Sequence, residues 1–457
     1  MISTKRVVIT GLGAMSPLGP AKNLFQNIKD SKIGINTLQN FLDLEFDQND
    51  KINQKSKYLH PEFQQERFES FNLNFLAYVN QSTNSLQQEF MNKNPIYKKH
   101  LSYSNRSSMM AIKSCQEALL DSGLLDQSRL TDKSLSEMPR TQKNLGNLEF
   151  YPPERTGVSL GTTLLGFIDV TRLEQQINDS NRYKNSISPY FIPKILNNTP
   201  SGIISMIYNL RGPSTSHSEA CATGNHSIGD GYLAIKYNRA DCMIVGATDS
   251  CLDPSVIGGF ARARALTKAN TIENASIPFD KKRSGFVIGE GAGVLVLEEL
   301  EMAKKRGATI YAEIKGYSAT NDAFHMTAPS ENGEAAYNAM RIVMEDQKNK
   351  LLPVDYVNAH ATSTPIGDDI ELRAIQKLFG SENELPYISS SKGALVWLMC
   401  QLLYRFHINS SIVTHKIKYY YPKRLINSRP DSCLRLRSKR LKYSLFLFIG
   451  YLQKMLI

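Results

Sequence analysis

The stretch SEACATGNHSIGDGYLAIKY, residues 218–237, places Cys221 just ahead of a segment that is able to form a helix. At a helix N-terminus, unpaired backbone N–H groups and a macrodipole equivalent to roughly half a positive charge favour a thiolate over a thiol. An ordinary thiol, with a pKa of about 8.5, is mostly protonated at neutral pH, so this position favours reactivity. Free cysteines are also common in protein cores, and the local sequence leaves a purely structural Cys221 as the alternative.

The residues around Cys221 fit a tight turn between a strand and a helix. The small residues Ala222, Thr223 and Gly224 permit close approach, and ADCMIVGATDS (240–250) is typical of a buried strand. Strand and helix patterns alternate from residue 5 to 255 and again, more briefly, from 256 to 393. This alternation predicts a mixed α/β fold.

The N-terminal stretch RVVITGLGAMSPLG predicts a strand followed by a glycine-rich turn. A dinucleotide-binding fingerprint is not satisfied there, because Ser16 stands where the third glycine would be. Further along, NRSSMMAIKSCQEALLDSGLL (105–125) has apolar residues at helical spacing, and Cys115 belongs to that apolar stripe. We therefore expect Cys115 to pack in the core.

Three later motifs follow the cysteine segment in order. They are PFDKKRSGFVIGEGAGVLVLEEL (278–300), YVNAHATSTPIGDDIE (356–371) and SSSKG (389–393). With the N-terminal VVITGLGAMSPLG, they resemble a beta-ketoacyl-acyl-carrier-protein synthase, a condensing enzyme of the thiolase fold, nearest to the animal mitochondrial form. The resemblance implies two similar halves stacked in αβαβα layers, the second half being incomplete here.

The resemblance also implies a role for each matching residue. Cys221 would take the acyl chain as a thioester, and His360 would polarise the malonyl thioester carbonyl as carbon dioxide leaves. Thr362 and Thr364 match residues that hydrogen-bond the pantetheine arm of the substrate. Glu371 and Lys392 would form a supporting pair that holds the active-site histidines in place. The alternative interpretation of Lys392 is an ordinary surface lysine without such a role.

The expected partners follow from the same resemblance. The substrates would be carried on the phosphopantetheine of acyl carrier protein, no cofactor would be bound, and the chain would form a homodimer. In the family, the segment FIPKILNNTPSGIISMIYNLRG (191–212) contributes to the dimer interface and the acyl pocket.

Several other motifs favour structural interpretations. The glycine-rich GFVIGEGAG (285–293) lacks the Lys-Ser/Thr of a phosphate-binding loop. No Cys/His cluster has the spacing of metal ligands, so no metal is predicted. Phe279, Asp280 and Arg283 are expected to have a structural role. His217 and His226 are expected to pack beside the site, and His325 is expected to lie in a loop near its mouth.

The family pattern stops abruptly after Gly393. The family's second catalytic histidine stands five residues beyond the lysine, where this chain has Trp397, and the late GFGGTN turn is missing. Residues 394–457 carry 12 Lys or Arg and one acid, Asp431, and thus the whole net charge of +11. We therefore divide the chain into residues 1–255 with the nucleophile, a partial second half at 256–393, and a basic tail at 394–457 without consistent periodicity.

Composition and cysteine content indicate the kind of compartment in which the protein is expected. The chain has 457 residues, 41% of them hydrophobic, enough for a sizeable core, and its six cysteines lack regular spacing, which favours a reducing compartment. No apolar run reaches 18 residues, so no membrane span is predicted. The resemblance implies a mitochondrial location, although no transit peptide is visible before the first strand; the cytoplasm is the alternative.

Two functional interpretations remain open at this point. The first is an active 3-oxoacyl-[acyl-carrier-protein] synthase of fatty acid biosynthesis, and the second is a catalytically defective or non-enzymatic paralogue or isoform. A degradative thiolase would need a late Cys-x-Gly motif, which Cys400 and Cys433 do not provide. Nucleic-acid binding through the basic tail is not predicted, because the body of the chain is neutral and has no binding motif.

Overall fold

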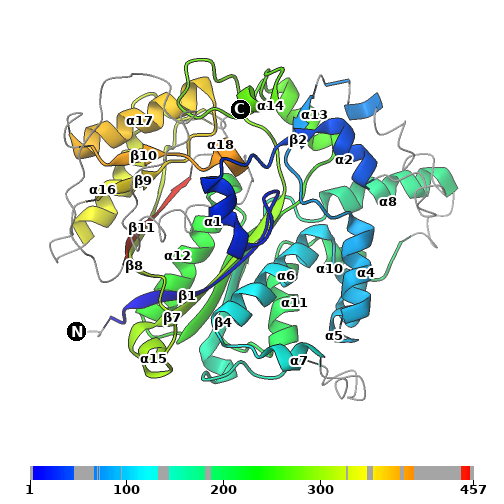
Figure 1. The fold of residues 1–457 in the computed structure, drawn as a ribbon, viewed down its shortest axis with the longest axis vertical. Coiled ribbons are helices and arrows are strands. Elements are labelled where there is room, and N and C mark those ends of the chain that lie inside the picture. Colours follow the sequence, from blue (N-terminus) through cyan, green and yellow to red (C-terminus); the bar gives the residue numbers. More distant parts are fainter. Residues whose placement is uncertain are drawn as a thin grey trace.

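A seven-stranded mixed sheet runs through the centre of the computed structural model (Figure 1). Its strands lie in the order β11–β8–β1–β7–β6–β4–β5. Strand β1 is antiparallel to β7 and β8, β6 is antiparallel to β7 and parallel to β4, β4 is also parallel to β5, and β11 is parallel to β8. The strands are β1 Val7–Met15, β4 Thr156–Gly161, β5 Ser214–Thr215, β6 Cys242–Asp249, β7 Gly291–Glu299, β8 Ala312–Asn321 and β11 Ser444–Leu452.

The structure describes residues 4–45, 66–68, 70–71, 73–93, 95–131, 144–180, 187–325, 328–346, 354–380, 385–395 and 444–452. Two small sheets accompany the large one: an antiparallel pair, β2 Asn36–Thr37 with β3 Phe75–Leu76, and a parallel pair, β9 Tyr356–Asn358 with β10 Tyr387–Ser389. Within these residues, no helix is both long and apolar enough to cross a membrane.

The helices and short 3₁₀ turns connect and cover the strands. In the first part of the chain they are α1 Ala21–Lys29, α2 Leu38–Glu45, α4 Thr83–Lys93, α5 Pro95–His100, η3 Leu101–Tyr103, α6 Arg106–Asp121, α7 Gln127–Thr131, η5 Pro153–Arg155, α8 Phe167–Ser180, α10 Phe191–Ile195 and α11 Thr199–Tyr208. They continue with η6 Ala220–Ala222, α12 Thr223–Lys236, α13 Pro254–Arg262, α14 Ile272–Ala275, α15 Leu300–Lys305, α16 Glu334–Asp346, α17 Pro365–Phe379 and α18 Lys392–Leu395.

The central strands are buried on both faces. Successive side chains of a strand point to opposite faces, and in β6 Cys242 and Ile244 join one hydrophobic core while Met243 and Val245 join another. The first core includes residues of α6 and α11, and the second includes residues of α12. Helices therefore cover the sheet on both sides (Figure 1), which explains why β1, β6 and β7 are buried along their whole length.

The glycines of β1 bring α6 close to the sheet. A Cβ atom on Gly11 would lie 2.3 Å from the Ala118 carbonyl oxygen, and one on Gly13 would lie 1.9 Å from the Ser114 carbonyl oxygen. These glycines are therefore needed for helix–strand packing. Close packing therefore explains why this segment is rich in glycine although it satisfies no nucleotide-binding fingerprint. Cys115, also on α6, is fully buried, as predicted.

The chain from β8 onward adds a smaller α/β unit at one end of the sheet. Helices α16 and α17 pack together with β9 and β10 around a core that includes Met340, Ala374 and Ile375. The mixed α/β class predicted from the sequence is confirmed. The division of the chain at residue 255 stays a prediction.

Nine residues of the basic tail belong to the large sheet. Strand β11 pairs with β8 in parallel register from Ser444 opposite Ala312 to Leu452 opposite Asn321, with one irregularity between Phe446 and Leu447. The backbone of β11 also lies beside α12, α16 and the turn η6. The tail sequence has no consistent period, so it does not predict this strand. The other tail residues after Leu395 lie outside the described residues.

A buried ion pair ties α6 to the turn before β7. The Arg106 guanidinium donates to both carboxylate oxygens of Glu290, at 2.8 and 2.5 Å, and also to the Gln81 carbonyl at 2.8 Å. Glu290 also accepts from the Val79 amide at 3.0 Å and the Ser250 hydroxyl at 2.7 Å. The side chains of Arg106 and Glu290 are only 10% and 1% exposed. Loss of either partner would leave a buried charge without compensation.

We expect Arg106→Met to lower the free energy of unfolding by about 3–5 kcal/mol, because Glu290 would stay buried without its cation. The matched control is Arg211→Met, whose exposed contact with Glu154 spans 3.9 Å and should contribute at most about 1 kcal/mol. Denaturant titration followed by circular dichroism measures both. Equal losses in the two variants would contradict the importance of the buried pair.

Candidate active site

Cys221 lies in the 3₁₀ turn η6, immediately before α12. The preceding residue, Ala220, has φ of 46°, a left-handed conformation that is unusual for a residue with a side chain. The turn is closed by a hydrogen bond from the Ala222 amide to the Glu219 carbonyl at 3.0 Å, and Glu219 N–H donates to the Thr223 hydroxyl at 2.8 Å. The predicted placement of the thiol at the beginning of a helix is therefore observed.

Cys221 differs from the other cysteines in the described part of the chain. Cys115, Cys242 and Cys251 are completely buried, and burial raises the pKa of each of their thiols. Cys221 is only partly buried and packs against the hydrophobic core that contains Phe286. Among the described cysteines, it alone combines exposure with a position at a helix beginning.

The backbone of His360 is held from two sides. The Glu371 carboxylate, on α17, accepts the His360 amide through one oxygen and the Ala361 amide through the other, each at 2.7 Å. The Lys392 ammonium, on α18, donates to the His360 carbonyl. Lys392 is only 2% exposed, so it is not an ordinary surface lysine. Glu371 and Lys392 thus both contact the backbone at His360, where the resemblance implies a supporting pair; their role in the reaction stays a prediction.

Thr362 and Thr364 lie together in the loop that follows β9. Their hydroxyl oxygens are 3.1 Å apart, and both residues are buried. Between them, Ser363 has φ of 67°. Its carbonyl accepts from Gly285 N–H at 2.9 Å, and its hydroxyl accepts from the amide of Ile277 at 3.0 Å. These bonds hold a backbone conformation that is costly for a residue other than glycine.

Residues 276–288 connect the Cys221 turn with the loop of His360. At one end, the Ser276 hydroxyl donates to the Lys392 carbonyl at 2.7 Å. In the middle, Arg283 donates to the Thr364 carbonyl at 2.9 Å, which gives this arginine the structural role that was predicted. At the other end, Phe286, Val287 and Ile288 belong to the core against which Cys221 packs. One segment thus supports both groups of predicted site residues.

Comparison with known proteins identifies the family. The family model "Beta-ketoacyl synthase, N-terminal domain" matches residues 4–303, and "Beta-ketoacyl synthase, C-terminal domain" matches residues 311–397. The chain belongs to the beta-ketoacyl synthase family. The second match ends close to Gly393, where the sequence predicts that the family pattern stops.

Relatives and solved structures agree with this assignment. The chain is 38% identical to the mitochondrial 3-oxoacyl-[acyl-carrier-protein] synthase of Arabidopsis thaliana, with 86% of this chain and 78% of that protein covered. It is 33% identical to 3-oxoacyl-[acyl-carrier-protein] synthase 2 of Staphylococcus aureus, with 86% and 81% covered. A beta-ketoacyl synthase from Burkholderia phymatum superposes with a TM-score of 0.70 at 26% identity, with 97% and 92% covered.

These findings confirm the predicted fold and enzyme class. The fold is that of the thiolase-like ketosynthases, and the chain is a condensing acyltransferase of fatty acid biosynthesis. The interpretation as a non-catalytic paralogue is not favoured. Trp397, which stands at the position of the family's second catalytic histidine, lies outside the described residues.

The sequence prediction missed a cluster beside Cys221. His217 and His226, expected to pack beside the site, come together with Glu219, and one potential ligand atom from each lies within 4.8 Å of the others. Asp230 and Glu219 raise the pKa of His217 to about 9, whereas burial lowers that of His226. The prediction of no metal-ligand cluster therefore differs from the structure. The pattern His-x-Glu, with a second histidine on the helix that follows, is the signal that could have found it.

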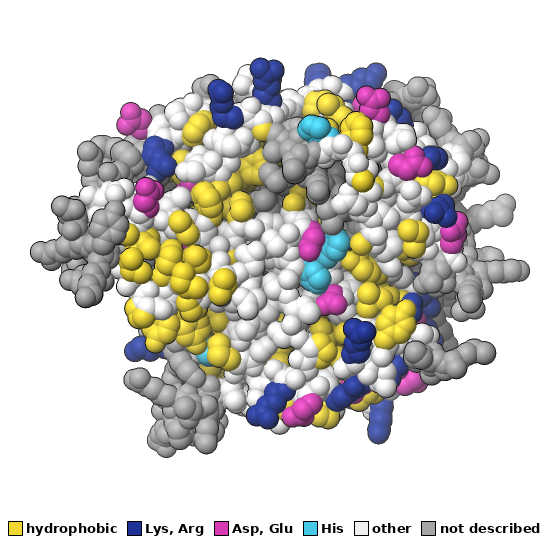
Figure 2. All heavy atoms as spheres, turned by 180° about the vertical axis from the view of Figure 1, so that it is seen from behind, with side chains coloured by type: hydrophobic (Ala, Val, Ile, Leu, Met, Phe, Trp, Pro, Cys, Tyr) yellow, Lys and Arg dark blue, Asp and Glu magenta, His cyan; other side chains and the backbone are white. Residues whose placement is uncertain are grey.

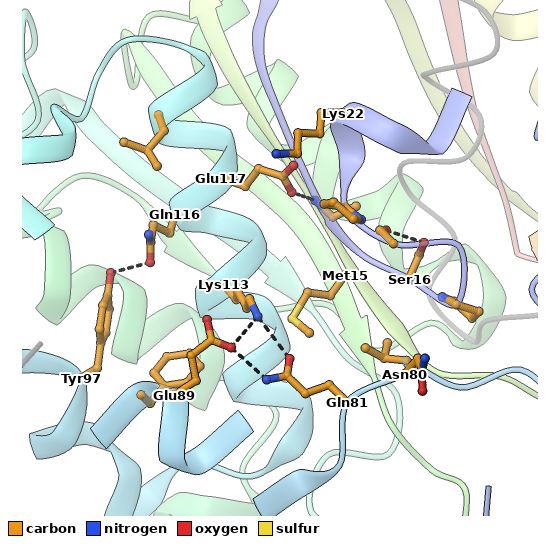
Figure 3. Close-up of a pocket in the computed structure, with 17 residues that line it drawn as sticks. Met15, Ser16, Lys22, Asn80, Gln81, Glu89, Tyr97, Lys113, Gln116 and Glu117 are labelled. Carbon is orange, nitrogen blue, oxygen red and sulfur yellow. Dashed lines mark hydrogen bonds and ion pairs between the residues drawn. The ribbon is translucent and has the colours of Figure 1, made fainter. Parts of the chain in front are cut away.

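A cavity of about 500 Å³ lies elsewhere, between the β1–α1 turn, α4 and α6 (Figure 3). None of the six predicted site residues lines it. The polar groups on its wall bond to one another: Lys113 to Glu89 at 2.7 Å and to Gln81 at 3.1 Å, and Gln81 to Glu89 at 2.9 Å (Figure 3). This mutual pairing favours a structural role for these groups over recognition of a ligand.

Asp368 should make the site region less stable as the pH rises. Its carboxylate is fully buried beneath the threonine loop, where it accepts from the amides of Phe279 and Thr364, and burial raises its pKa to about 6. A carboxyl whose folded pKa exceeds its unfolded value stabilises the fold below the unfolded pKa of 3.8, and this contribution is lost as the pH rises through about 6. Charging the buried group accounts for the loss.

We therefore expect the stability of the natural chain relative to Asp368→Asn to fall by about 2 kcal/mol between pH 4 and 7. Unfolding of both proteins across this range measures the difference, and Asp369→Asn removes the exposed neighbouring carboxylate as the matched control. A stability difference that does not change with pH would contradict the argument.

Proposed function

We propose that this chain is a 3-oxoacyl-[acyl-carrier-protein] synthase, which condenses an acyl thioester with a malonyl group on acyl carrier protein and releases carbon dioxide. The observation that carries the proposal is Cys221, partly exposed in the turn that leads into α12, while the other described cysteines are fully buried. The relatives from Arabidopsis thaliana and Staphylococcus aureus, which are named for this activity, support it.

In the first half-reaction, the Cys221 thiolate attacks the carbonyl carbon of acyl-acyl carrier protein. A thioester bond forms to the Cys221 sulfur, and the bond to the pantetheine sulfur breaks, so the carrier protein leaves as a free thiol after taking up a proton. The 14-residue helix α12 directs its N-terminal end toward this turn. The positive end of the helix dipole would stabilise the thiolate and the developing oxyanion.

In the second half-reaction, malonyl-acyl carrier protein loses carbon dioxide as its carboxyl C–C bond breaks. The enolate that is left attacks the Cys221 thioester, a new carbon–carbon bond forms, and the Cys221 thiolate is released with a 3-oxoacyl product on the carrier. We assign to His360 the donation of a hydrogen bond from Nε2 to the enolate oxygen. Glu371 and Lys392 would position this histidine through its backbone.

Thr362 and Thr364 would bind the pantetheine arm, because hydroxyl groups suit a ligand that is rich in amides. Acyl carrier protein is therefore the proposed partner and the source of the prosthetic arm, and no resident cofactor enters the two half-reactions. The proposed location is the mitochondrion, because the relative from Arabidopsis thaliana and one from Schizosaccharomyces pombe are mitochondrial forms.

The two half-reactions depend on different parts of the chain. Acylation uses Cys221 and α12, which precede the break in the family pattern, whereas condensation in the family also uses the second histidine and the late glycine turn. Loss of a single oxyanion donor typically lowers a rate by about 10²–10³. We therefore propose that self-acylation partly survives in this chain, whereas condensation is much slower than in a synthase that carries both histidines.

Intact-mass spectrometry after incubation with acyl-acyl carrier protein tests the nucleophile. We expect one acyl adduct on the natural chain and none on Cys221→Ala, because the proposed acceptor sulfur is absent. The control is the double variant Cys400→Ser/Cys433→Ser, which removes two tail thiols and should keep the adduct. An adduct on Cys221→Ala would contradict the assignment.

Glu371→Gln separates the two half-reactions in the same assay. A glutamine amide has one acceptor oxygen in place of two, so one of the bonds from His360 and Ala361 would be lost. We expect the adduct to form normally while carbon dioxide release from malonyl-acyl carrier protein falls by about tenfold or more, as expected for a hydrogen bond to a charged group. Equal loss of both activities would contradict a role confined to His360.

We also propose a homodimer formed through the segment around α10 and α11. This segment exposes an apolar group whose members are 46–59% exposed: Ile187, Tyr190, Ile192, Leu196 and Met206. Figure 2 shows hydrophobic side chains gathered on the side of the molecule where these helices lie. Apolar groups of this kind commonly mark an interface.

Sedimentation analysis tests this proposal. We expect a dimer for the natural chain and a monomer for Ile192→Asp, because a charge would be buried at the interface. The matched control, Ile366→Asp on α17, alters an isoleucine that is 66% exposed outside the segment and should remain dimeric. A dimeric Ile192→Asp would exclude this surface.

A further inference from the structure

Three potential metal ligands surround the nucleophile turn. His217 and Glu219 precede Cys221 by four and two residues, and His226 follows it by five on α12. One nitrogen or oxygen atom from each lies within 4.8 Å of the others. On the face shown in Figure 2, histidine and acidic side chains gather near the centre.

His226 is held in the orientation of a metal ligand. Its Nδ1 lies 3.1 Å from the hydroxyl of Tyr317, on β8, while its Nε2 is buried and has no hydrogen-bond partner. The residue is 91% buried, since only 9% of its surface is exposed. A buried nitrogen without a partner is costly, and a histidine with one ring nitrogen bonded and the other available is typical of metal sites.

The other two residues of the cluster also have polar atoms that form no hydrogen bond. His217 Nε2 and Glu219 Oε2 are buried without hydrogen-bond partners, although the side chains are 25% and 29% exposed elsewhere. His217 Nδ1 lies 3.7 Å from Glu219 Oε1, and His217 Nε2 lies 3.6 Å from Asp230 Oδ2. These separations are too long for hydrogen bonds. Three unsatisfied polar atoms thus come from the three residues that cluster.

The donor set fits a transition metal better than calcium or magnesium. Two imidazoles and one carboxylate form a borderline set that suits zinc, and tetrahedral zinc with bonds of about 2.1 Å separates its ligand atoms by about 3.4 Å. Small side-chain rotations would close the observed spacing to this value. The partial exposure of His217 and Glu219 leaves room for water as the fourth ligand.

We propose that His217, Glu219 and His226 bind one zinc ion, or a similar divalent transition metal. Tyr317 orients His226 through the contact of its hydroxyl with Nδ1, and Asp230 lies beside His217. The ion ties the loop before Cys221 to the helix after it and so fixes the nucleophile turn from both sides. This site is separate from the condensation chemistry and does not depend on the proposed function.

Cobalt(II) and zinc titrations of the full chain, after treatment with a chelator, test the site. We expect one ion per chain and visible cobalt bands of a nitrogen- and oxygen-ligated centre, without the intense near-ultraviolet absorption of a cobalt–thiolate bond. Cys221→Ala should bind equally well. Thiolate absorption that disappears in Cys221→Ala would overturn the proposed ligand set.

Ligand variants complete the test. His217→Ala, Glu219→Gln and His226→Gln should each weaken binding more than tenfold, and Tyr317→Phe should weaken it by about 10–100-fold. The control His325→Ala removes a histidine outside the cluster and should retain one site. Because His226 is buried, circular dichroism must show that its variant is folded, and the partly exposed Glu219→Gln keeps the test decisive. Unchanged affinity in His217→Ala and Glu219→Gln would refute the site.

Discussion

Burial of β6 and β7 on both faces is the constraint on which the site depends. Alternate side chains of these strands enter two separate cores, so α6 with α11 and α12 must lie on opposite sides of the sheet. Helix α12 can approach closely because Gly161, at the end of β4, has no side chain: a Cβ there would lie 2.2 Å from the Thr223 methyl. The packing of α12 thereby determines where Cys221 lies.

The second group of site residues is positioned by hydrogen bonds more than by hydrophobic packing. Glu371 and Lys392 fix the His360 backbone from α17 and α18, and the segment 276–288 fixes the threonine loop from the other side. A left-handed Ser363 persists in this loop because its carbonyl and hydroxyl are both engaged. The proposed site thus relies on a left-handed backbone conformation at Ser363 that these hydrogen bonds stabilise.

The sequence predicts the parts of the site that consist of local motifs. Cys221 before a helix is a contiguous pattern that needs no distant partner to be recognised. His360 and its two threonines also form a contiguous motif, but the family resemblance is what implied their roles. The connection of Lys392 with His360 spans 32 residues, and only the family resemblance indicated it. The segment 276–288 was expected to be structural, but its contact with both groups depends on tertiary packing that no local pattern reveals.

Two features were not predicted from the sequence. The histidine–glutamate cluster has its three members within one ten-residue stretch, but the contact that orients His226 comes from Tyr317 on β8, 91 residues away along the chain. Strand β11 pairs with β8 across more than 120 residues, and its nine residues follow a basic stretch whose composition gave no period. Non-local pairings of this kind depend on which edge is available and not on the local sequence alone.

Strand β11 changes what the break in the family pattern means. The family match ends at residue 397, yet the edge of β8 is covered over its whole length, and the backbone of β11 lies beside the turn that holds Cys221. An uncovered edge would expose unpaired backbone groups next to the nucleophile. Since this edge is paired, the break need not disturb the sheet that supports acylation. On the proposed function, the break would act through the particular side chains that the family places after the lysine, and so on the condensation step.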